Sequence, residues 1–393
     1  MRGESESRPF SAGSRTGRAP DDNVVIPDPA GFGDVAAPAG AGARQPKLLP
    51  PNPVFRFYRG GDGIDALRGC KPGEGPGAPE DWVGSTTTSL GSDREGLATL
   101  PDGTLLRDAI ATDPAGYLGP EHVARFGANP GVLVKLLDAG ERLAVHFHPG
   151  RAFAREHLGS PFGKTESWII LTAEPGAHMD FGLREPIDRA TLARWVERQD
   201  SEEMLAALHQ VPVKAGDVLL VPAGTLHTIG AGITLIELQE PSDMSVVLER
   251  ERFDVSAQEA TLGLGWDVIL TAAQLEPTAP LFGGAGAPPA ADPGAPPPPG
   301  STRRNLLPEA ADPYFRAEWI VAGGTGVQLE PSFAVLLVIQ GEITITAPGA
   351  EPLQVNRGGA ALVPFGAGAT TVSGNGTVVR CLPPSVNSRE GKW

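Results

Sequence analysis

Paired histidines are the first residues of this chain whose type and spacing suggest chemistry. All seven histidines lie within residues 122–227, and His146 and His148 stand two residues apart in the β-prone run ERLAVHFHPG. Because side chains alternate between the two faces of a strand, both imidazoles leave the same face. Such a pair can bind a metal ion, since imidazole is the commonest side-chain ligand for metals. Two hydrogen-bonded or solvent-facing histidines explain this spacing equally well.

A second histidine segment follows a turn. It has the order G-x5-P-x-G-x2-H and consists of Gly216, Pro222, Gly224 and His227. Pro and Gly restrict the turn and can aim His227 inward, although a histidine in a turn is more often an ordinary capping residue. Gly140 precedes the first pair in the order G-x5-H-x-H. Since residues 301–393 contain no histidine, a metal bound by imidazole is expected only in the preceding block.

The segments that must position these residues are short and β-prone. In the C-terminal part, the runs WIVAG, AVLLVIQGEITITA, PLQVN and AALVPFG are broken by Gly, Pro and Asn, a pattern typical of an antiparallel sandwich or barrel. KAGDVLLVPAGTLHTIGAGITLIEL has the same rhythm as VNRGGAALVPFGAGATTVSG, which indicates a weak internal repeat of one β unit. Residues 186–209 carry apolar residues at helical spacing and predict two short helices.

Glycine and proline indicate the domain boundaries. The 51 Gly and 40 Pro residues disfavour a helical bundle. We predict a disordered arm over residues 1–48, a metal-binding domain over 49–275 with the helical insert, a Pro/Gly-rich linker over 276–300, and a second β domain over 301–393 without metal ligands.

The composition of the chain limits the classes of molecule that it is expected to bind. With 32 basic and 47 acidic residues the net charge is −15, which argues against a general affinity for nucleic acid or an anionic membrane. The sequence has no signal-peptide core and no stretch approaching the ~20 apolar residues of a membrane span, so we expect a cytoplasmic protein. Cys70 and Cys381 are too few for a disulfide framework and match no zinc motif. The sequence does not indicate the oligomeric state.

Several segments together resemble the type I phosphomannose isomerases of the cupin superfamily. They are LVKLLDAGERLAVHFHP, GKTESWIIL, VKAGDVLLVPAGTLHTIGAG, ELQEPSD and PEDWVGS, and the resemblance runs from about residue 54 to 255 and more loosely beyond. It implies a mainly β fold of two cupin-type (jelly-roll) barrels with a small helical insert. It also implies an aldose–ketose isomerase that interconverts mannose 6-phosphate and fructose 6-phosphate through an enediol.

The resemblance also implies the metal ligands. They fall on His146, His148, Glu166 and His227. His146 stands where the family has a glutamine, which restores the three-histidine, one-glutamate set of other cupins. Such a set accepts Zn, Fe, Mn or Ni, and we expect a single zinc.

The residues for proton transfer that the resemblance implies are Lys164, Glu237, Asp243 and Glu80. Isomerisation needs a base that moves a proton between C1 and C2 and an electrophile that stabilises the enediolate. A buried Lys or Glu beside a cation has the tunable pKa that this requires. From the residues alone, Lys164 could as well be a solvated lysine at a strand end, and Glu237 could face outward.

Two positions depart from the family pattern where a phosphate would bind. Ala144 stands in place of a serine that contacts phosphate, and Val247 in place of an arginine. Arginine is the natural bidentate partner of a phosphate or an enediolate. Arg250 or Arg252 could replace it if the strand were bulged, although exposed positions are favoured for both. Arg56, Arg59 and Arg68 surround the Gly60-Gly61 turn and are further candidates for an anion contact, although a turn that joins two strands is the more common explanation of such glycines.

These departures leave three functions open. The first is the phosphomannose isomerase reaction, with a small-molecule sugar phosphate as partner. The second is isomerisation of an unphosphorylated or different sugar. The third is a non-catalytic cupin that senses sugar, against which the presence of the complete set of candidate proton-transfer residues argues.

Overall fold

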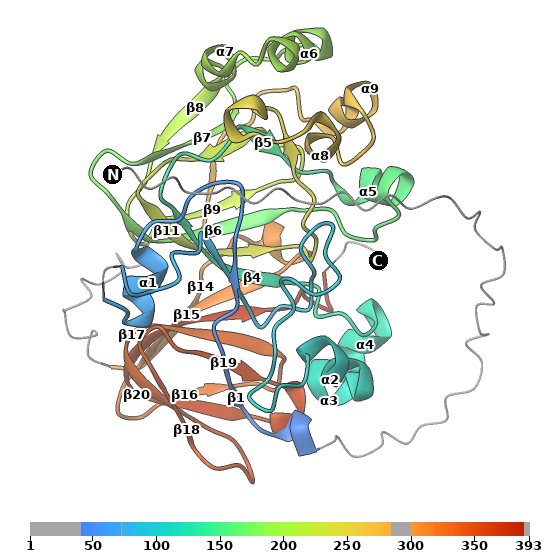
Figure 1. Ribbon diagram of the computed structural model, residues 1–393. Coiled ribbons are helices and arrows are strands. Elements are labelled where there is room, and N and C mark those ends of the chain that lie inside the picture. Colours follow the sequence, from blue (N-terminus) through green and yellow to red (C-terminus); the bar gives the residue numbers. More distant parts are fainter. Residues whose placement is uncertain (1–40, 72, 284–299, 389–393) are drawn as a thin grey trace, which may run out of the picture. The chain divides into compact units, whose positions relative to one another are not determined.

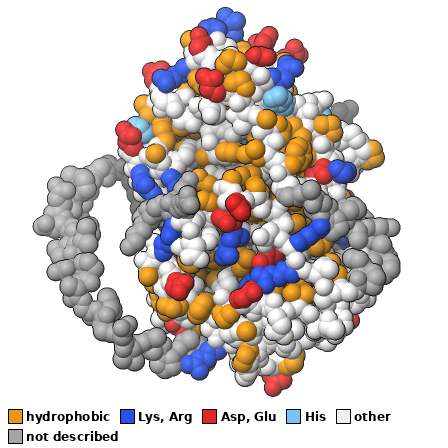
Figure 2. Space-filling model, turned by 180° about the vertical axis from the view of Figure 1, so that it is seen from behind, with side chains coloured by type: hydrophobic (Ala, Val, Ile, Leu, Met, Phe, Trp, Pro, Cys, Tyr) orange, Lys and Arg blue, Asp and Glu red, His pale blue; other side chains and the backbone are white. Residues whose placement is uncertain are grey.

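The computed structural model describes residues 41–71, 73–283 and 300–388, and it is mainly β with antiparallel sheets (Figure 1). Most of the predicted arm and of the predicted linker lie outside these residues. None of the described helices is long and apolar enough to cross a membrane. On the face seen in Figure 2, acidic and basic side chains are interspersed.

The first block, which runs from β2 to β13 over residues 53–282, contains two sheets. The larger has the strand order β13-β9-β6-β11-β4-β3-β2, and the smaller has the order β12-β5-β10-β7-β8. The larger sheet is made of β2 (Pro53–Val54), β3 (Glu80–Val83), β4 (Leu133–Ala139), β6 (Glu166–Ala173), β9 (Val218–Val221), β11 (Ile233–Gln239) and β13 (Leu281–Phe282). The smaller is made of β5 (His146–Phe147), β7 (His178–Leu183), β8 (Leu208–Pro212), β10 (His227–Ile229) and β12 (Val246–Val247). Since β13 pairs with β9, the first block extends into the predicted linker.

The C-terminal block is one eight-stranded sheet, with the main order β1-β19-β17-β20-β15-β14. Its strands are β1 (Lys47–Leu49), β14 (Thr302–Asn305), β15 (Arg316–Ala322), β16 (Val327–Leu329), β17 (Ala334–Thr346), β18 (Leu353–Asn356), β19 (Ala360–Val363) and β20 (Thr370–Leu382). Strand β1 comes from the N-terminal end and pairs with β19, from Lys47 opposite Leu362 to Leu49 opposite Ala360. Regular structure therefore begins before residue 48, the predicted end of the arm.

The central strands of the larger sheet bury both faces. On β4, Leu136 packs in a core shared with Val335 and Leu337 of the C-terminal block, whereas Leu137 packs in a core with Trp168 of the first block. This double burial explains why β4, β6 and β11 are almost continuous apolar runs rather than alternating ones. Lys135 of β4 shares the face of Leu137, so it points into the first block.

Helices lie at the top and along the sides of the molecule in Figure 1. The predicted helical pair is present as α6 (Arg189–Arg198) and α7 (Ser201–Ala206). Asp188 and Asp200 precede these helices, and their carboxylates accept hydrogen bonds from backbone N–H groups of the first turns. Leu192 and Val196 of α6 pack with Phe147 of β5. The other helices are α1 (Gly63–Arg68), α2 (Leu106–Thr112), α3 (Pro114–Leu118), α4 (Pro120–Phe126), α5 (Arg151–Leu158), α8 (Ala257–Ala260) and α9 (Trp266–Ile269).

Candidate active site

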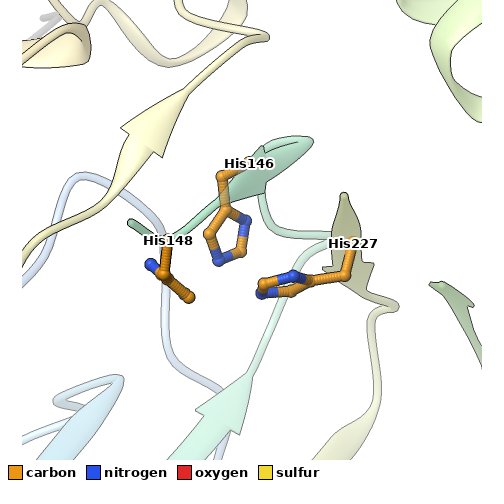
Figure 3. A group of neighbouring side chains, drawn as sticks. All are labelled: His146, His148 and His227. Carbon is orange, nitrogen blue, oxygen red and sulfur yellow. The ribbon is translucent and has the colours of Figure 1, made fainter. Parts of the chain in front are cut away.

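Three histidines converge in the first block (Figure 3). His146 and His227 lie directly opposite each other on β5 and β10, and His148 follows β5. One ring nitrogen from each of the three lies within 4.8 Å of the others. The ring centroids of His146 and His227 are 4.2 Å apart. Two segments that are about 80 residues apart in the chain thus meet by strand pairing.

Backbone carbonyls orient all three rings. The Nδ1 atoms of His146, His148 and His227 each lie 2.8 Å from a carbonyl oxygen, those of Ala144, Met244 and Thr225 respectively. A carbonyl oxygen only accepts, so each Nδ1 carries the proton and each Nε2 presents a lone pair. This is how proteins fix histidine ligands for a metal. Among the described residues, Nε2 of His148 and of His227 are buried and have no hydrogen-bond partner.

Glu166 completes the donor set. It begins β6, and its carboxylate oxygens lie 3.0 Å from Nε2 of His148 and 3.7 Å from Nε2 of His227. With Nδ1 protonated, a neutral His148 turns a lone pair toward the carboxylate, and two acceptors repel each other unless a proton or cation lies near both. The Nε2 acceptors of His148 and His227, buried and without donors among the described residues, therefore fit a bound cation that Glu166 would share.

Shifted pKa values favour neutral side chains for the three histidines and an ionised one for Glu166. Burial lowers the pKa of His146 and His148 and lowers that of His227 to about 3. Burial raises the pKa of Glu166, but the neighbouring His148 and Lys164 more than offset this and hold it well below its ordinary value. At neutral pH the histidines are neutral and the glutamate is ionised, as metal ligands must be.

A cavity of about 40 Å³ adjoins His146 and Glu166, with room for a few water molecules. Its charged and polar lining comprises Arg56, Tyr58, Glu80, Lys135, Lys164, Glu237 and Ser245. Its apolar lining comprises Phe57, Leu137, Leu143, Ala144, Ile229 and Val247. The residues come from both sheets of the first block, so the cavity lies between them.

Lys135 is a site residue that the sequence analysis missed. It is 2% exposed, and its Nζ lies 3.5 Å from Glu80 and 3.7 Å from Glu237. Strand pairing sets this contact, because Lys135 is the register partner of Glu237 on β11. Burial lowers the pKa of Lys135, but Glu237 and Glu80 more than offset this and raise it. A single lysine inside the apolar run VLVKLL was the available sign.

Glu80 and Asp243 both pair with Arg56, which lines the cavity. Arg56 donates two hydrogen bonds to Asp243, of 3.0 and 3.1 Å, and its Nε lies 3.7 Å from Glu80. Glu80 also accepts hydrogen bonds from Tyr58 and from Trp82. Burial raises the pKa of Asp243, but Arg56 overcomes this and holds it at about 2. Asp243 is therefore a permanent anion that holds Arg56.

Glu237 and Lys164 line the cavity, and both interact with the charge of Glu166. Burial and the charge of Glu166 raise the pKa of Glu237 to about 8. The Nζ of Lys164 lies 3.2 Å from Glu166 and donates to Ser245 Oγ at 3.3 Å. The cavity thus combines a carboxyl group that titrates near neutral pH with an ammonium group beside the candidate metal site.

The structure brings nearly all of the predicted site residues to this cavity. The four predicted ligands lie together, and Lys164, Glu237 and Glu80 line the cavity. Asp243 is not part of the cavity lining, but it accepts hydrogen bonds from Arg56, which is. Their chemical roles stay predictions. The two residues that depart from the family pattern, Ala144 and Val247, are on the cavity wall.

Arg250 and Arg252, the alternative substitutes for the missing arginine, lie outside the cavity, as the favoured interpretation of the sequence expected. Arg250 pairs with the exposed Glu251. The side chain of Arg252 is 53% exposed. Neither contributes to the cavity lining, and Arg56 is the arginine that does.

Comparison with known proteins gives a consistent family likeness. No protein-family model matches the chain. It is 36% identical over 154 residues to a mannose-6-phosphate isomerase of Streptococcus mutans, which is 38% of this chain and 47% of the relative. It is 38% identical over 112 residues to a mannose-6-phosphate isomerase of Bacillus subtilis, which is 28% of this chain and 34% of the relative. The chain spans about half or less of the length of the curated relatives it matches.

Solved structures extend the likeness in fold. The mannose 6-phosphate isomerase of Bacillus subtilis superposes with a TM-score of 0.65 at 22% identity, over 86% of this chain and 99% of that one. The apo form of the enzyme from Salmonella typhimurium gives 0.64 at 16% identity, over 86% and 99%. The resemblance inferred from the sequence is confirmed: the chain is similar in sequence to mannose-6-phosphate isomerases over part of its length, and it shares their fold over most of it.

Proposed function

We propose that this chain is a metal-dependent aldose–ketose isomerase that interconverts mannose 6-phosphate and fructose 6-phosphate through an enediol. The observation that carries the proposal is the convergence of three histidines, each oriented through Nδ1, and Glu166 beside a cavity that contains Lys164 and Glu237. The mannose-6-phosphate isomerases among its relatives support the choice of substrate.

Nε2 of His146, His148 and His227 and the carboxylate of Glu166 would hold one divalent metal. Three neutral nitrogens and one carboxylate oxygen suit Zn, our first choice, and also Fe, Mn or Ni. When bound, such a metal polarises a carbonyl or hydroxyl oxygen of the sugar as a Lewis acid. The buried, partnerless Nε2 atoms of His148 and His227 support this occupancy.

The surrounding side chains would handle the proton. Glu237 is buried on the cavity wall and would take the proton from one carbon and return it to the other. Lys135, 3.7 Å away, would orient its carboxyl group. Lys164 would donate to a sugar oxygen that gains negative charge. Glu80 holds Lys135 and Arg56, and Asp243 holds Arg56, so these acids would act by positioning the cations.

An unphosphorylated sugar is the second candidate substrate, and the cavity wall favours it. Ala144 and Val247 offer no polar group to a phosphate. The three cations that line the cavity already face carboxylates: Arg56 faces Asp243, Lys135 faces Glu80 and Glu237, and Lys164 faces Glu166. A phosphate would have to compete with these ion pairs.

The test is an assay of purified protein with measured metal content. Conversion of mannose 6-phosphate to fructose 6-phosphate is followed with and without chelator, and then conversion of mannose to fructose. We expect chelator-sensitive conversion of the phosphosugar. Conversion of mannose alone would select the second candidate. A metal-loaded protein that binds sugar and converts neither would contradict both and favour a sensing role. Cytoplasmic location stays a prediction.

A further inference from the structure

The segment that carries Lys164 and leads into Glu166 is held by a buried carboxylate. Glu240 follows β11 and is 1% exposed. Its two carboxylate oxygens accept from the backbone N–H of Gly163 at 3.3 Å and of Thr165 at 3.1 Å. The backbone N–H of Glu240 in turn donates to the carbonyl of Thr165 at 3.1 Å. The residues on both sides of Lys164 are thus fixed to one side chain.

A single arginine neutralises this carboxylate. Arg151, the first residue of α5, donates through Nε to Glu240 at 2.6 Å. Its NH2 group donates to the carbonyl of Pro313 at 3.0 Å, and its guanidinium lies 4.4 Å from the ring centroid of Tyr314. Pro313 and Tyr314 precede β15 and belong to the C-terminal block. A chain of contacts therefore runs from that block through Arg151 and Glu240 to the segment before Glu166.

We propose that Glu240 is a positioning residue for Lys164 and Glu166, and that Arg151 anchors it to the C-terminal block. The block without histidines would then serve the site directly, by holding the backbone that presents one metal ligand and one proton donor. This inference rests on the proposed function only for the roles of Lys164 and Glu166. The positioning itself concerns the backbone and can be measured without turnover.

The chemistry of the contact argues for positioning rather than simple packing. A carboxylate that accepts two backbone N–H bonds fixes two peptide planes, and Lys164 lies between them. A buried carboxylate is retained at a cost unless its charge is paired, and here the pair reaches into another block. Residues that orient metal ligands in this indirect way typically contribute 10–100-fold to metal affinity or activity.

The experiment compares Glu240→Ala, Glu240→Gln and Arg151→Lys with the unaltered full-length protein. Hydrogen exchange is followed in peptides that cover Gly163 to Thr165, and metal affinity is measured by competition with a chelator. We expect Glu240→Ala to speed exchange in this segment selectively and to weaken metal binding about 10–100-fold. Glu240→Gln keeps one acceptor oxygen and should be intermediate, and Arg151→Lys should be mildest because a charge remains.

Arg303→Ala is the matched control. It removes ion pairs of 2.8 Å with Glu318 and with Glu330 in the C-terminal block, away from the cavity. It should leave exchange in the Gly163–Thr165 segment and metal affinity unchanged. Equal loosening by Arg303→Ala, or unaltered exchange and affinity in Glu240→Ala, would overturn the inference.

Kinetics separate the two proposals. If the unaltered protein is an isomerase, Glu240→Ala should lower kcat more than it raises KM, because the reacting groups are misplaced while the sugar-binding wall stays intact. If the unaltered protein shows no isomerase activity, the proposed function fails. Exchange and metal affinity still decide the role of Glu240 in that case.

Discussion

The two blocks use a similar β unit, and they differ in what lies inside it. In the first block, Gly216 (φ 89°) precedes β9 and Pro222 follows it. In the C-terminal block, Gly358 (φ 76°) precedes β19 and Pro364 follows it, at the same spacing. This agrees with the internal repeat inferred from the sequence. Both glycines need the left-handed conformation that other residues adopt at a cost.

The units diverge after the proline. In the first block the turn leads directly into β10, so that His227 is 1% exposed. In the C-terminal block a 3-10 turn, Phe365–Ala367, intervenes, and β20 begins only at Thr370. Ala369, which has the spacing of His227, is exposed. A short difference in turn geometry therefore separates the inward-facing His227, a candidate metal ligand, from the exposed Ala369.

The interiors differ accordingly. In the first block, Lys135, Glu166 and Glu237 occupy inward positions on the central strands, where their charges must be paired. In the C-terminal block, apolar residues such as Val338 and Val378 form the inner core, and the buried charges of Glu318 and Arg380 are paired at 3.0 Å. Both blocks thus bury charges in pairs, and among the described residues the group of convergent histidines lies in the first block, so the blocks differ in this histidine group rather than in buried charge as such.

The largest effect is expected from removing a ligand in the first block. His148→Ala and His227→Ala should each abolish metal content and isomerase activity, because each removes one of four convergent donors. Metal analysis of the purified variants checks this. His178→Ala is the control, since this histidine lies on β7 outside the cluster and should retain full metal. A His227→Ala protein with one full equivalent of metal would contradict the ligand assignment.

Removing the proposed proton carrier should have the next largest effect. Glu237→Gln keeps the size of the side chain and loses its ability to exchange a proton, so kcat should fall about 10²–10⁴-fold. Metal content should stay at one equivalent, since Glu237 is not among the proposed ligands. Steady-state kinetics on the metal-loaded protein provide the measurement, and a kcat within a factor of about three of the unaltered protein would assign the proton transfer elsewhere.

Val247→Arg tests the substrate side of the first block. An added guanidinium on the cavity wall should raise kcat/KM for mannose 6-phosphate relative to mannose by about 10–100-fold, the range of a charge-assisted contact. Val247 is buried, so the thermal midpoint is measured first to verify folding. Val247→Met controls for added bulk. An unchanged ratio in a folded Val247→Arg protein would show that phosphate is not recognised at this wall.

The polar centre should also make the stability of the metal-free protein depend on pH. Burial and Glu166 raise the pKa of Glu237 from 4.5 to about 8 in the folded state. Between these values the folded protein binds more protons than the unfolded chain, so this group lowers stability as pH rises. Denaturant unfolding in the presence of chelator should show a steeper fall over this window for the unaltered protein than for Glu237→Gln. Equal slopes would exclude the raised pKa.

The smallest effect is expected from placing a histidine in the C-terminal unit. Ala369→His puts an imidazole at the spacing of His227, but the position is exposed, and in the part of the chain that the structure describes no group of convergent donors lies in the C-terminal block. Metal content should remain at one equivalent, and the free energy of unfolding should change by no more than about 0.5 kcal/mol. A second equivalent of metal would show that the two units are closer in geometry than their turns indicate.

The predictable part of the site depends on short-range periodicity. His146 and His148 share a face because they are two positions apart in the chain, and Lys164 reaches Glu166 for the same reason. The helices α6 and α7 were predictable because apolar residues recur at helical spacing. Lys135 was not, because its role depends on the strand β11 that lies beside it, a pairing about 100 residues distant in the chain.

The sequence by itself determined the His146–His148 pair, the position of the helical insert and the repeated β unit, since each depends on spacings of a few residues, whereas the full set of candidate ligands came from the family resemblance. Only the tertiary structure decided that β1 joins the C-terminal sheet, that Asp243 pairs with Arg56, and that Glu240 contacts Arg151, which reaches the C-terminal block. These features come from strand register and from the pairing of buried charges. Both join residues far apart in the chain, and local periodicity contains no information about such contacts.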